Sequence, residues 1–541
     1  MCVTSRAETR HESEAEFGGR GTTLTGVALA TAVALNGEDL SLADVWAVAV
    51  DGARAELSDD GRAKLRAARD LVDAAASETS GEHTYGINTG FGRFVERTIP
   101  PELSEELQLR LLRSHACGVG DRYPAEVVRA AMVLRANALA KGYSGARIET
   151  VELLLRCLNT GVLPVVPSRG SVGASGDLAP LAHLALPLVG EGRATFDGEE
   201  LAGAEALARA GLEPVRLAAK EGLSLINGTQ FMAAIGSLAL VRARRLATSA
   251  DIACALSLEA LQGSRASFRA EIHELRPHPG QTASAANIAR LLEGSAIIEA
   301  HRWCDKVQDA YSLRCAPQVH GASRDLLAYA ERTLQIEVNA ATDNPLVFTD
   351  AGELVSNGNF HGQPVAFALD AAAMAIAELA NISERRVERL TNPSLSDGLP
   401  AFLTHDGGLN SGFMIPQYVS ASLVSENKVL CHPASVDSIP TSAGQEDHVS
   451  MGNASALTCW QVLANSERAL AIELLAAAQG VEFLAPLEPG AGARAAHDLV
   501  RAHSATVLED RSLAQDIEAV AELIRNGVLV SAVEHAVGEL A

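Results

Sequence analysis

The sequence predicts a mainly α-helical protein in which a long central helical bundle follows a mixed, loop-rich N-terminal head. Two observations predict this fold. Hydrophobic residues make up 48% of the chain and aromatic residues only 4%, with Ala and Leu recurring throughout, a composition that favours helices packed on helices. Beyond Asn227, apolar residues recur every three or four positions over long blocks, which is the period of an amphipathic helix.

The longest helices are predicted in the C-terminal part of the chain. Examples are Ala233 to Leu261, Ala366 to Leu390 and Ala454 to Gln479. Blocks of this length favour a bundle over alternating βαβ units. The segment from Glu482 to Arg494 is rich in Pro and Gly, so we expect it to connect the bundle to a last helical piece.

Shorter helices are predicted in the head, separated by two glycine-rich loops. The loops are Gly81 to Gly92 and Pro164 to Asp177, where the density of turn formers excludes a stable helix. Shaped loops between strong helices often carry function. The predicted helices begin near Gly61 and cover Leu103 to Leu112, Ala125 to Lys141 and Val151 to Leu158.

These patterns divide the chain into three parts. Residues 1–23 are polar and charged and are predicted to be a flexible extension. Residues 24–226 form the head with both glycine-rich loops, and residues 227–541 form the elongated bundle with its C-terminal helical segment.

Charge and cysteine usage exclude several classes of protein. The formal net charge is −23, from 44 Lys and Arg against 67 Asp and Glu, which repels nucleic acid and anionic membranes. The eight cysteines are scattered without a CxxC pair, a pattern typical of buried free thiols in a reducing compartment. No HExxH motif or paired Cys/His spacing occurs, so no metal is expected.

The apolar run from Thr23 to Leu35 raises the question of a signal peptide. The residues before it mix Arg with several Glu and do not form a basic leader region. No uninterrupted apolar run reaches the roughly 18 residues of a membrane span. We therefore expect a cytoplasmic protein without a membrane partner.

The segment from Gly170 to His183, GSVGASGDLAPLAH, offers a source of chemical reactivity within the chain itself. If the Gly176 amide nitrogen attacks the Ala174 carbonyl carbon, a five-membered ring closes, and loss of the Ser175 hydroxyl as water leaves an exocyclic methylidene. Glycine avoids a Cβ clash during this close approach. Motifs for phosphate or dinucleotide binding and for a serine nucleophile elbow do not occur in the sequence.

The same segment resembles the signature of the aromatic amino acid lyases and aminomutases, whose prosthetic group is 4-methylideneimidazole-5-one (MIO). The resemblance runs from about Leu24 to Gln479. It implies that Ala174, Ser175 and Gly176 form the MIO with no external cofactor, and that Asp177 assists cyclisation. Further matching segments are TYGINTGFG, RSHACGVG, LAKGYSG, KEGLSLINGTQ, QDAYSLRC, TDNPLVF, GNFHGQP, NSGFM and QEDHVSMG.

The resemblance also implies roles for single residues. Tyr85 matches the catalytic tyrosine, Arg314 matches the arginine that binds the substrate carboxylate, and Phe360 packs beside the prosthetic group. A guanidinium suits a carboxylate because it binds both oxygens at once. Polar residues that hold the carboxylate or the MIO oxygen match Asn227, Gln308, Tyr311 and Asn344.

Plainer interpretations of three of these residues remain open. Tyr85 is also explained as a turn tyrosine packed on a helix. Asn344 is also explained as an Asx-turn residue, and Arg314 as one half of a surface salt bridge.

Two positions bear on the substrate. Family members that act on phenylalanine or tyrosine often carry Phe-Leu or His-Leu in place of Ser114-His115, and Gln in place of Glu446. Glu446 therefore resembles the histidine-specific branch, and a carboxylate suits an imidazole N–H by a charge-assisted hydrogen bond. His115 and Met414 are expected to line the same pocket. Helix capping by His115 and a helix-N-terminal carboxylate at Glu446 are the structural alternatives.

The implied reaction is elimination of ammonia from L-histidine to give trans-urocanate, with Tyr85 or Glu446 removing the β-proton. The family is typically a homotetramer whose sites are shared between subunits. Two alternatives are an MIO-dependent lyase or 2,3-aminomutase for tyrosine or a related aromatic amino acid, and an inactive helical scaffold.

Overall fold

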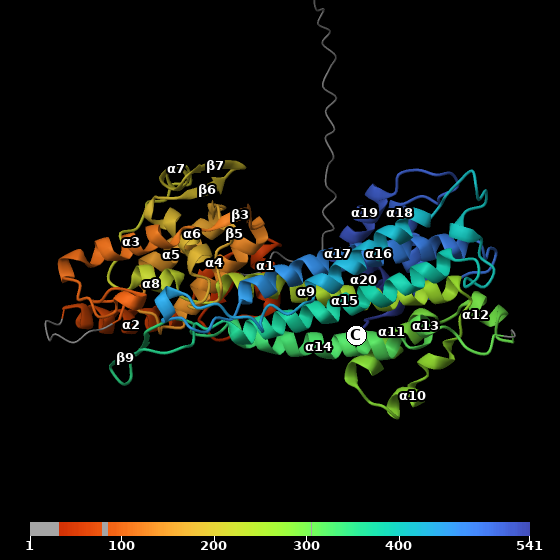
Figure 1. Ribbon diagram of the computed structural model, residues 1–541, viewed down its shortest axis with the longest axis horizontal. Helices are drawn as coiled ribbons and strands as arrows, with labels where there is room; N and C mark the ends of the chain where they lie inside the picture. Colours follow the sequence, from red (N-terminus) through yellow and green to blue (C-terminus); the bar gives the residue numbers. More distant parts are fainter. Residues whose placement is uncertain (1–31, 78–84, 304–305) are drawn as a thin grey trace, which may run out of the picture.

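A computed structural model of the chain describes residues 32–77, 85–303 and 306–541. The described residues contain twenty α-helices and nine short strands, which confirms the predicted mainly α-helical fold. Figure 1 shows an elongated molecule, with the head at one end and long parallel and antiparallel helices filling the rest. The predicted N-terminal extension and the first four residues of the Gly81 to Gly92 loop lie outside the described residues.

The head combines short helices with small sheets. Its strands pair as β1 (Val33–Leu35) with β2 (Ala55–Leu57), β3 (Val119–Arg122) with β5 (Pro167–Arg169), and β6 (Arg193–Phe196) with both β4 (Leu163–Pro164) and β7 (Glu199–Ala202). β1 and β2 are parallel, and the other pairs are antiparallel. The helices of the head are α1 (Leu42–Ala49), α2 (Asp59–Ser77), α3 (Ser104–His115), α4 (Ala125–Ala140), α5 (Ile148–Thr160), α6 (Leu178–Ala185), α7 (Gly203–Arg209) and α8 (Glu221–Ile226).

Long helices build the bundle, and the three that were predicted by their bounds lie within a few residues of the observed ones. At its centre, α17 (Gly452–Glu482) packs against both α15 (Gln363–Thr391) and α9 (Gln230–Ala260), while α14 (Ala316–Glu337) packs on α15. α15 is apolar and long enough to cross a membrane, but 67% of its apolar window is buried in the molecule, as befits a core helix. The other helices are α10 (Ala270–Glu274), α11 (Pro279–Leu291), α12 (Ala296–Ala300), α13 (Tyr311–Arg314), α16 (Met414–Leu430), α18 (Ala491–His503), α19 (Ala514–Arg525) and α20 (Val528–Val537).

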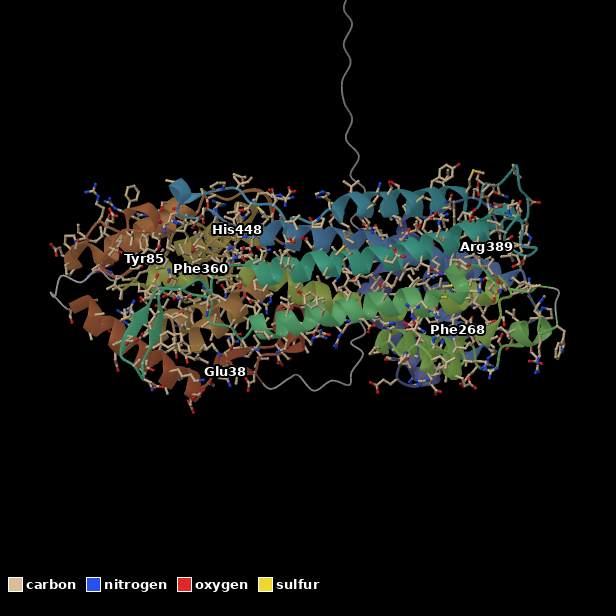
Figure 2. All side chains as sticks on the ribbon, turned by 60° about the horizontal axis from the view of Figure 1, so that its bottom comes forward. Glu38, Tyr85, Phe268, Phe360, Arg389 and His448 are labelled. Atoms are coloured by element: carbon tan, nitrogen blue, oxygen red, sulfur yellow. The ribbon has the colours of Figure 1, made fainter. Side chains whose placement is uncertain are left out.

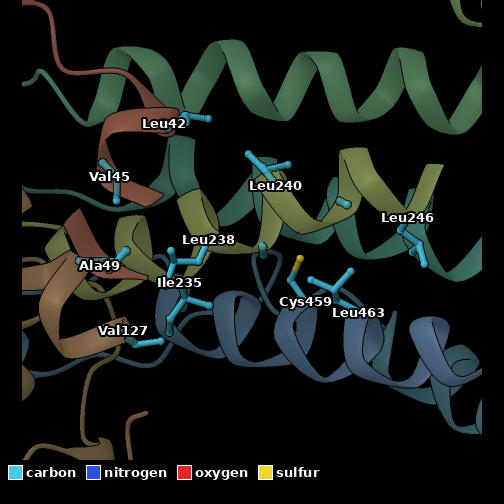
Figure 3. Close-up of a cluster of buried hydrophobic side chains, with 14 of the residues drawn as sticks. Leu42, Val45, Ala49, Val127, Ile235, Leu238, Leu240, Leu246, Cys459 and Leu463 are labelled. Carbon is cyan, nitrogen blue, oxygen red and sulfur yellow. The ribbon is translucent and has the colours of Figure 1, made fainter. Parts of the chain in front are cut away.

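Head and bundle share one hydrophobic core. Figure 3 shows Leu42 and Val45 of α1 above Ile235 and Leu238 of α9, with Leu463 of α17 on the other side of α9. All five side chains are buried. α9 is therefore packed between α1 of the head and α17 of the bundle.

The predicted connection from Glu482 to Arg494 is shorter in the structure. Only residues 483–490 connect α17 to α18, because the extended Gly490 starts a new helix and its carbonyl accepts the Arg494 N–H at 2.8 Å. The remaining short hairpin, β8 (Leu346–Phe348) with β9 (Glu353–Val355), projects beside the head and was not predicted from the sequence. Its three-residue strands are too short to carry a periodic signal.

Paired charges are buried inside the bundle. Arg386 of α15 and Glu473 of α17 are fully buried, with Arg386 Nη2 donating to Glu473 Oε2 at 2.8 Å. Ser257 of α9 donates its hydroxyl to the other carboxylate oxygen at 2.6 Å. The network thus ties the three central helices together.

We expect Glu473→Ala to destabilise the protein by about 3–5 kcal/mol, because it leaves the buried Arg386 guanidinium without its counter-charge. The midpoint of denaturant-induced unfolding at fixed protein concentration measures this loss. The control is Glu488→Ala, which removes an exposed ion pair with Arg494 and should change stability by less than about 1 kcal/mol. Equal effects of both substitutions would contradict the prediction.

Candidate active site

The Ala174-Ser175-Gly176 segment lies directly against the chain that leads into α9. Gly176 faces Gly228, and the Asp177 N–H donates to the Gly228 carbonyl at 2.7 Å. Gly176 has φ +71°, and a Cβ there would lie 2.1 Å from the Gly228 oxygen. Only glycine therefore permits this close approach of two backbones.

The Asp177 side chain connects the Ala174-Ser175-Gly176 segment to the start of α9. It is fully buried; its Oδ2 accepts the Met232 N–H at 2.9 Å and its Oδ1 accepts the Ser171 hydroxyl at 2.8 Å. Burial raises the pKa of Asp177 to about 6, although these hydrogen bonds act in the opposite direction. The carboxyl group is thus poised to exchange a proton near neutral pH.

Asn227 contacts Ser175 through its side-chain amide. Its Nδ2 donates to the Ser175 carbonyl oxygen at 2.9 Å and lies 3.0 Å from the Ser175 hydroxyl oxygen. The Asn227 carbonyl in turn accepts from the buried guanidinium of Arg135 at 2.7 Å. Asn227 follows α8, so the end of that helix orients the amide toward the three-residue segment.

Two adjoining cavities, of about 880 and 970 Å³, meet at this segment. Tyr85, Gly92, Ser175 and Glu446 line both cavities. In Figure 2, Tyr85, Phe360 and His448 lie close together in the head, while labelled residues of the bundle lie far from them. The first cavity is also lined by Ala174, Asn344 and Phe360, and the second by His115.

The hydroxyl of Tyr85 accepts the Gly92 N–H at 3.3 Å. Burial raises the pKa of Tyr85, and the negative charge of Glu446 adds to this, while the Gly92 hydrogen bond partly offsets it. Tyr85 therefore carries its proton at neutral pH in this conformation. Its ring packs edge-on against Phe91, with centroids 6.1 Å apart.

His115 is the last residue of α3, where its Nδ1 lies 2.9 Å from the Leu111 carbonyl oxygen. This contact fits the helix-capping alternative and places the ring on the second cavity as well. Burial lowers the pKa of His115, so the imidazole is neutral near pH 7. If Nδ1 donates to that carbonyl, Nε2 is left as an acceptor.

Four predicted site residues are not brought to Ser175 in the same chain. α13, which contains Tyr311 and Arg314, lies in the part of the bundle away from the head (Figure 1). Gln308 lines a separate cavity of about 610 Å³. Met414 begins α16, which contacts the C-terminal part of α15 through a Gln417–Glu384 hydrogen bond at 3.0 Å.

The surroundings of Arg314 differ from a surface salt bridge. Its guanidinium carbon lies 4.6 Å from the ring centroid of Tyr311, whose side chain is 72% exposed. Within the described part of the chain, Arg314 has no ion-pair partner, and its buried Nε–H donates no hydrogen bond.

Some residues that line the cavities were not predicted from the sequence. His361 and His448 line the first cavity, and their rings stack in parallel at 5.7 Å. Both lie in segments that resemble the family, GNFHGQP and QEDHVSMG, and this resemblance could have identified them. Leu71 and Ala75 of α2 complete one wall, and no local motif marks them.

Fold and site together define a class of protein. It is a helical bundle whose head holds an Ala-Ser-Gly segment with its glycine against Gly228, beside a tyrosine and a carboxylate. The chain belongs to the aromatic amino acid lyase family, whose model matches residues 40–502. This confirms the family resemblance inferred from the sequence.

Two histidine ammonia-lyases and a tyrosine aminomutase match the chain over most of its length. The chain is 57% identical to a histidine ammonia-lyase from Gloeobacter violaceus, over 94% of this chain and 98% of the relative. The crystal structure of histidine ammonia-lyase from Trypanosoma cruzi is similar with a TM-score of 0.87 at 47% identity, covering 94% of this chain and 96% of that one. A tyrosine aminomutase from Streptomyces globisporus has a TM-score of 0.90 at 39% identity, covering 94% and 100%.

Proposed function

We propose that the protein eliminates ammonia from L-histidine to give trans-urocanate. The observation that carries this proposal is the Glu446 carboxylate, which lines both cavities together with Ser175 and Tyr85. An ionised carboxylate matches an imidazole N–H, whereas a phenyl ring would desolvate it without a partner, at a cost of several kcal/mol. The higher identity to histidine ammonia-lyases than to the tyrosine aminomutase supports the same choice.

The residues fit an MIO formed from Ala174, Ser175 and Gly176. Gly176 sits where a side chain cannot, the Asp177 carboxyl lies beneath it, and Asn227 donates to the Ser175 carbonyl oxygen. The MIO, once formed, supplies an electrophilic methylidene carbon that activates the bonds of the amino acid. No external cofactor and no metal enter the proposal.

Two groups are candidates for removing the β-proton. Tyr85 must first lose its own proton, and the Gly92 N–H then stabilises the phenolate oxygen. Glu446 is the alternative base, from the same cavities. Asn344 lines the first cavity, and its Oδ1 already accepts the Asn357 N–H at 2.9 Å, so only its Nδ2 remains to donate toward a substrate.

We also propose that the site is completed by other copies of the chain, in a homotetramer. Arg314, Tyr311, Gln308 and Met414 then bind the substrate in the site of a neighbouring copy. Exposed apolar side chains on two neighbouring helices of the bundle support assembly, because a monomer rarely exposes a large contiguous apolar patch. They include Phe367, Met374, Ile415, Tyr418, Val419 and Val429 on α15 and α16.

Phe360 is proposed to pack beside the prosthetic group, and the boundary between head and bundle is proposed at residues 226 and 227.

A cytoplasmic location is proposed from the charge and the free cysteines. Six cysteines lie in the described residues, all free; Cys157, Cys254 and Cys459 are buried as expected, but Cys117 is exposed.

The proposal is tested by incubating the purified protein separately with histidine, tyrosine and phenylalanine. We expect ammonia release and near-ultraviolet absorbance of a conjugated acid with histidine, and at least about tenfold lower kcat/KM with the other two. A β-amino acid product would instead support the aminomutase. Silence with all three, together with an unmodified intact mass, would support an inactive scaffold.

A further inference from the structure

The Glu446 side chain is held by a neighbour that the proposed chemistry does not use. Thr441 donates its hydroxyl to Glu446 Oε2 at 2.6 Å. Among the described residues, this is the one hydrogen bond made by the carboxylate, and both side chains are half-buried. Oε1 therefore remains to accept a hydrogen from a bound molecule.

The backbone between these residues forms a closed turn. The Thr441 N–H donates to the Glu446 carbonyl at 2.8 Å, and the Glu446 N–H donates to the Thr441 carbonyl at 3.3 Å. Ser442 and Ala443 both occupy the left-handed region, with φ of 51° and 53°. Non-glycine residues adopt this conformation only where surrounding contacts enforce it, so the turn is a shaped element.

The turn also contacts the Tyr85 loop. A Cβ at Gly92 would lie 2.8 Å from the Ser442 hydroxyl oxygen, so the two segments touch closely. Gly92 is the residue whose N–H donates to the Tyr85 hydroxyl. The turn that ends at Glu446 therefore lies directly beside the residue that donates to Tyr85.

A hydroxyl has a particular advantage as the donor to this carboxylate. It fixes one oxygen in direction but adds no positive charge, so the carboxylate keeps its full charge for an imidazole N–H. A carboxylate without such a donor would sample several rotamers and would have to be ordered when the substrate binds.

We propose that Thr441 is a positioning residue that sets selectivity for an imidazole side chain by holding the Glu446 carboxylate. This inference rests on the proposed function, in which Glu446 receives the imidazole. Thr441 itself does not touch the substrate.

Four variants test the inference: Thr441→Val, Thr441→Ser, Glu446→Gln and the double variant Thr441→Val/Glu446→Gln. Valine keeps the shape and removes the donor. We expect Thr441→Val to lower kcat/KM for histidine about 10- to 100-fold, the range for a hydrogen bond to a charged group. Thr441→Ser should keep most of the parent activity, because it keeps the hydroxyl.

The double variant separates positioning from a structural role. In the Glu446→Gln background we expect Thr441→Val to have little further effect, because the charged group that it orients is gone. The intact mass serves as a second readout: the water lost on ring formation should be the same in all four variants. Both readouts would differ if Thr441 merely supported the fold.

The possible failures are distinguishable. Parent-like kinetics of Thr441→Val beside a strongly impaired Glu446→Gln would overturn the role of Thr441 and leave the proposed function standing. Parent-like kinetics of Glu446→Gln would refute the role of Glu446 in receiving the imidazole, and with it the inference, whereas a parent protein that does not turn over histidine would overturn the proposed function itself. Equal losses from Thr441→Val in both backgrounds, or no rescue by serine, would assign Thr441 a structural role and also refute the inference.

Discussion

Ser175→Ala is expected to abolish turnover of histidine, a loss of more than about a thousandfold in kcat, while the helical fold persists. Alanine has no hydroxyl to lose, so no methylidene can form at residue 175. Two hydrogen bonds of the segment, from the Asp177 N–H to the Gly228 carbonyl and from the Ser171 hydroxyl to the Asp177 carboxylate, do not involve the Ser175 hydroxyl and should remain.

Two measurements on the Ser175→Ala protein check this expectation. Far-ultraviolet circular dichroism should match the parent, and intact mass should show that less water has been lost than in the parent. The control is Ser394→Ala, on an exposed turn after α15, which should behave as the parent. Normal activity of Ser175→Ala would refute the assignment of the MIO.

The second large effect concerns Arg314. Arg314→Ala alone should lower kcat/KM by about a hundredfold or more, because the substrate carboxylate loses the guanidinium that would bind both of its oxygens. Co-expression of Arg314→Ala chains with Ser175→Ala chains should restore activity. If each site takes Ser175 from one copy and Arg314 from another, random assembly leaves about a quarter of the sites intact.

The mixed assembly is isolated by two different affinity tags in succession, so that every measured oligomer contains both kinds of chain. Co-expression of two differently tagged Ser175→Ala chains is the matched control and should stay inactive. Inactive mixed oligomers would mean that Ser175 and Arg314 of the same chain form one site, contrary to the proposed assembly.

Much of the fold follows from local patterns. The bounds of α9, α15 and α17 lie within a few residues of those predicted, because apolar residues at helical spacing mark the buried face wherever that face packs. The short strands and the exact length of the connection after α17 were not predictable, since three-residue pairings depend on which segments meet in space.

The site, like the fold, was only partly predictable from the sequence. The chemistry of Ala174, Ser175 and Gly176 is a property of three adjacent residues, and a family signature carries it. No sequence pattern shows that Gly176 meets Gly228, or that Thr441 donates to Glu446 across a left-handed turn. These contacts depend on backbone conformation, which side-chain identity only partly constrains.

The sequence by itself determined the helical fold, the family and the segment that can become an electrophile, because periodicity and adjacent backbone chemistry are local properties. Only the tertiary structure decided which distant residues share a cavity. It brings Tyr85, Ser175 and Glu446 together and keeps Arg314 away from them, because these positions depend on how segments distant in the sequence pack against one another.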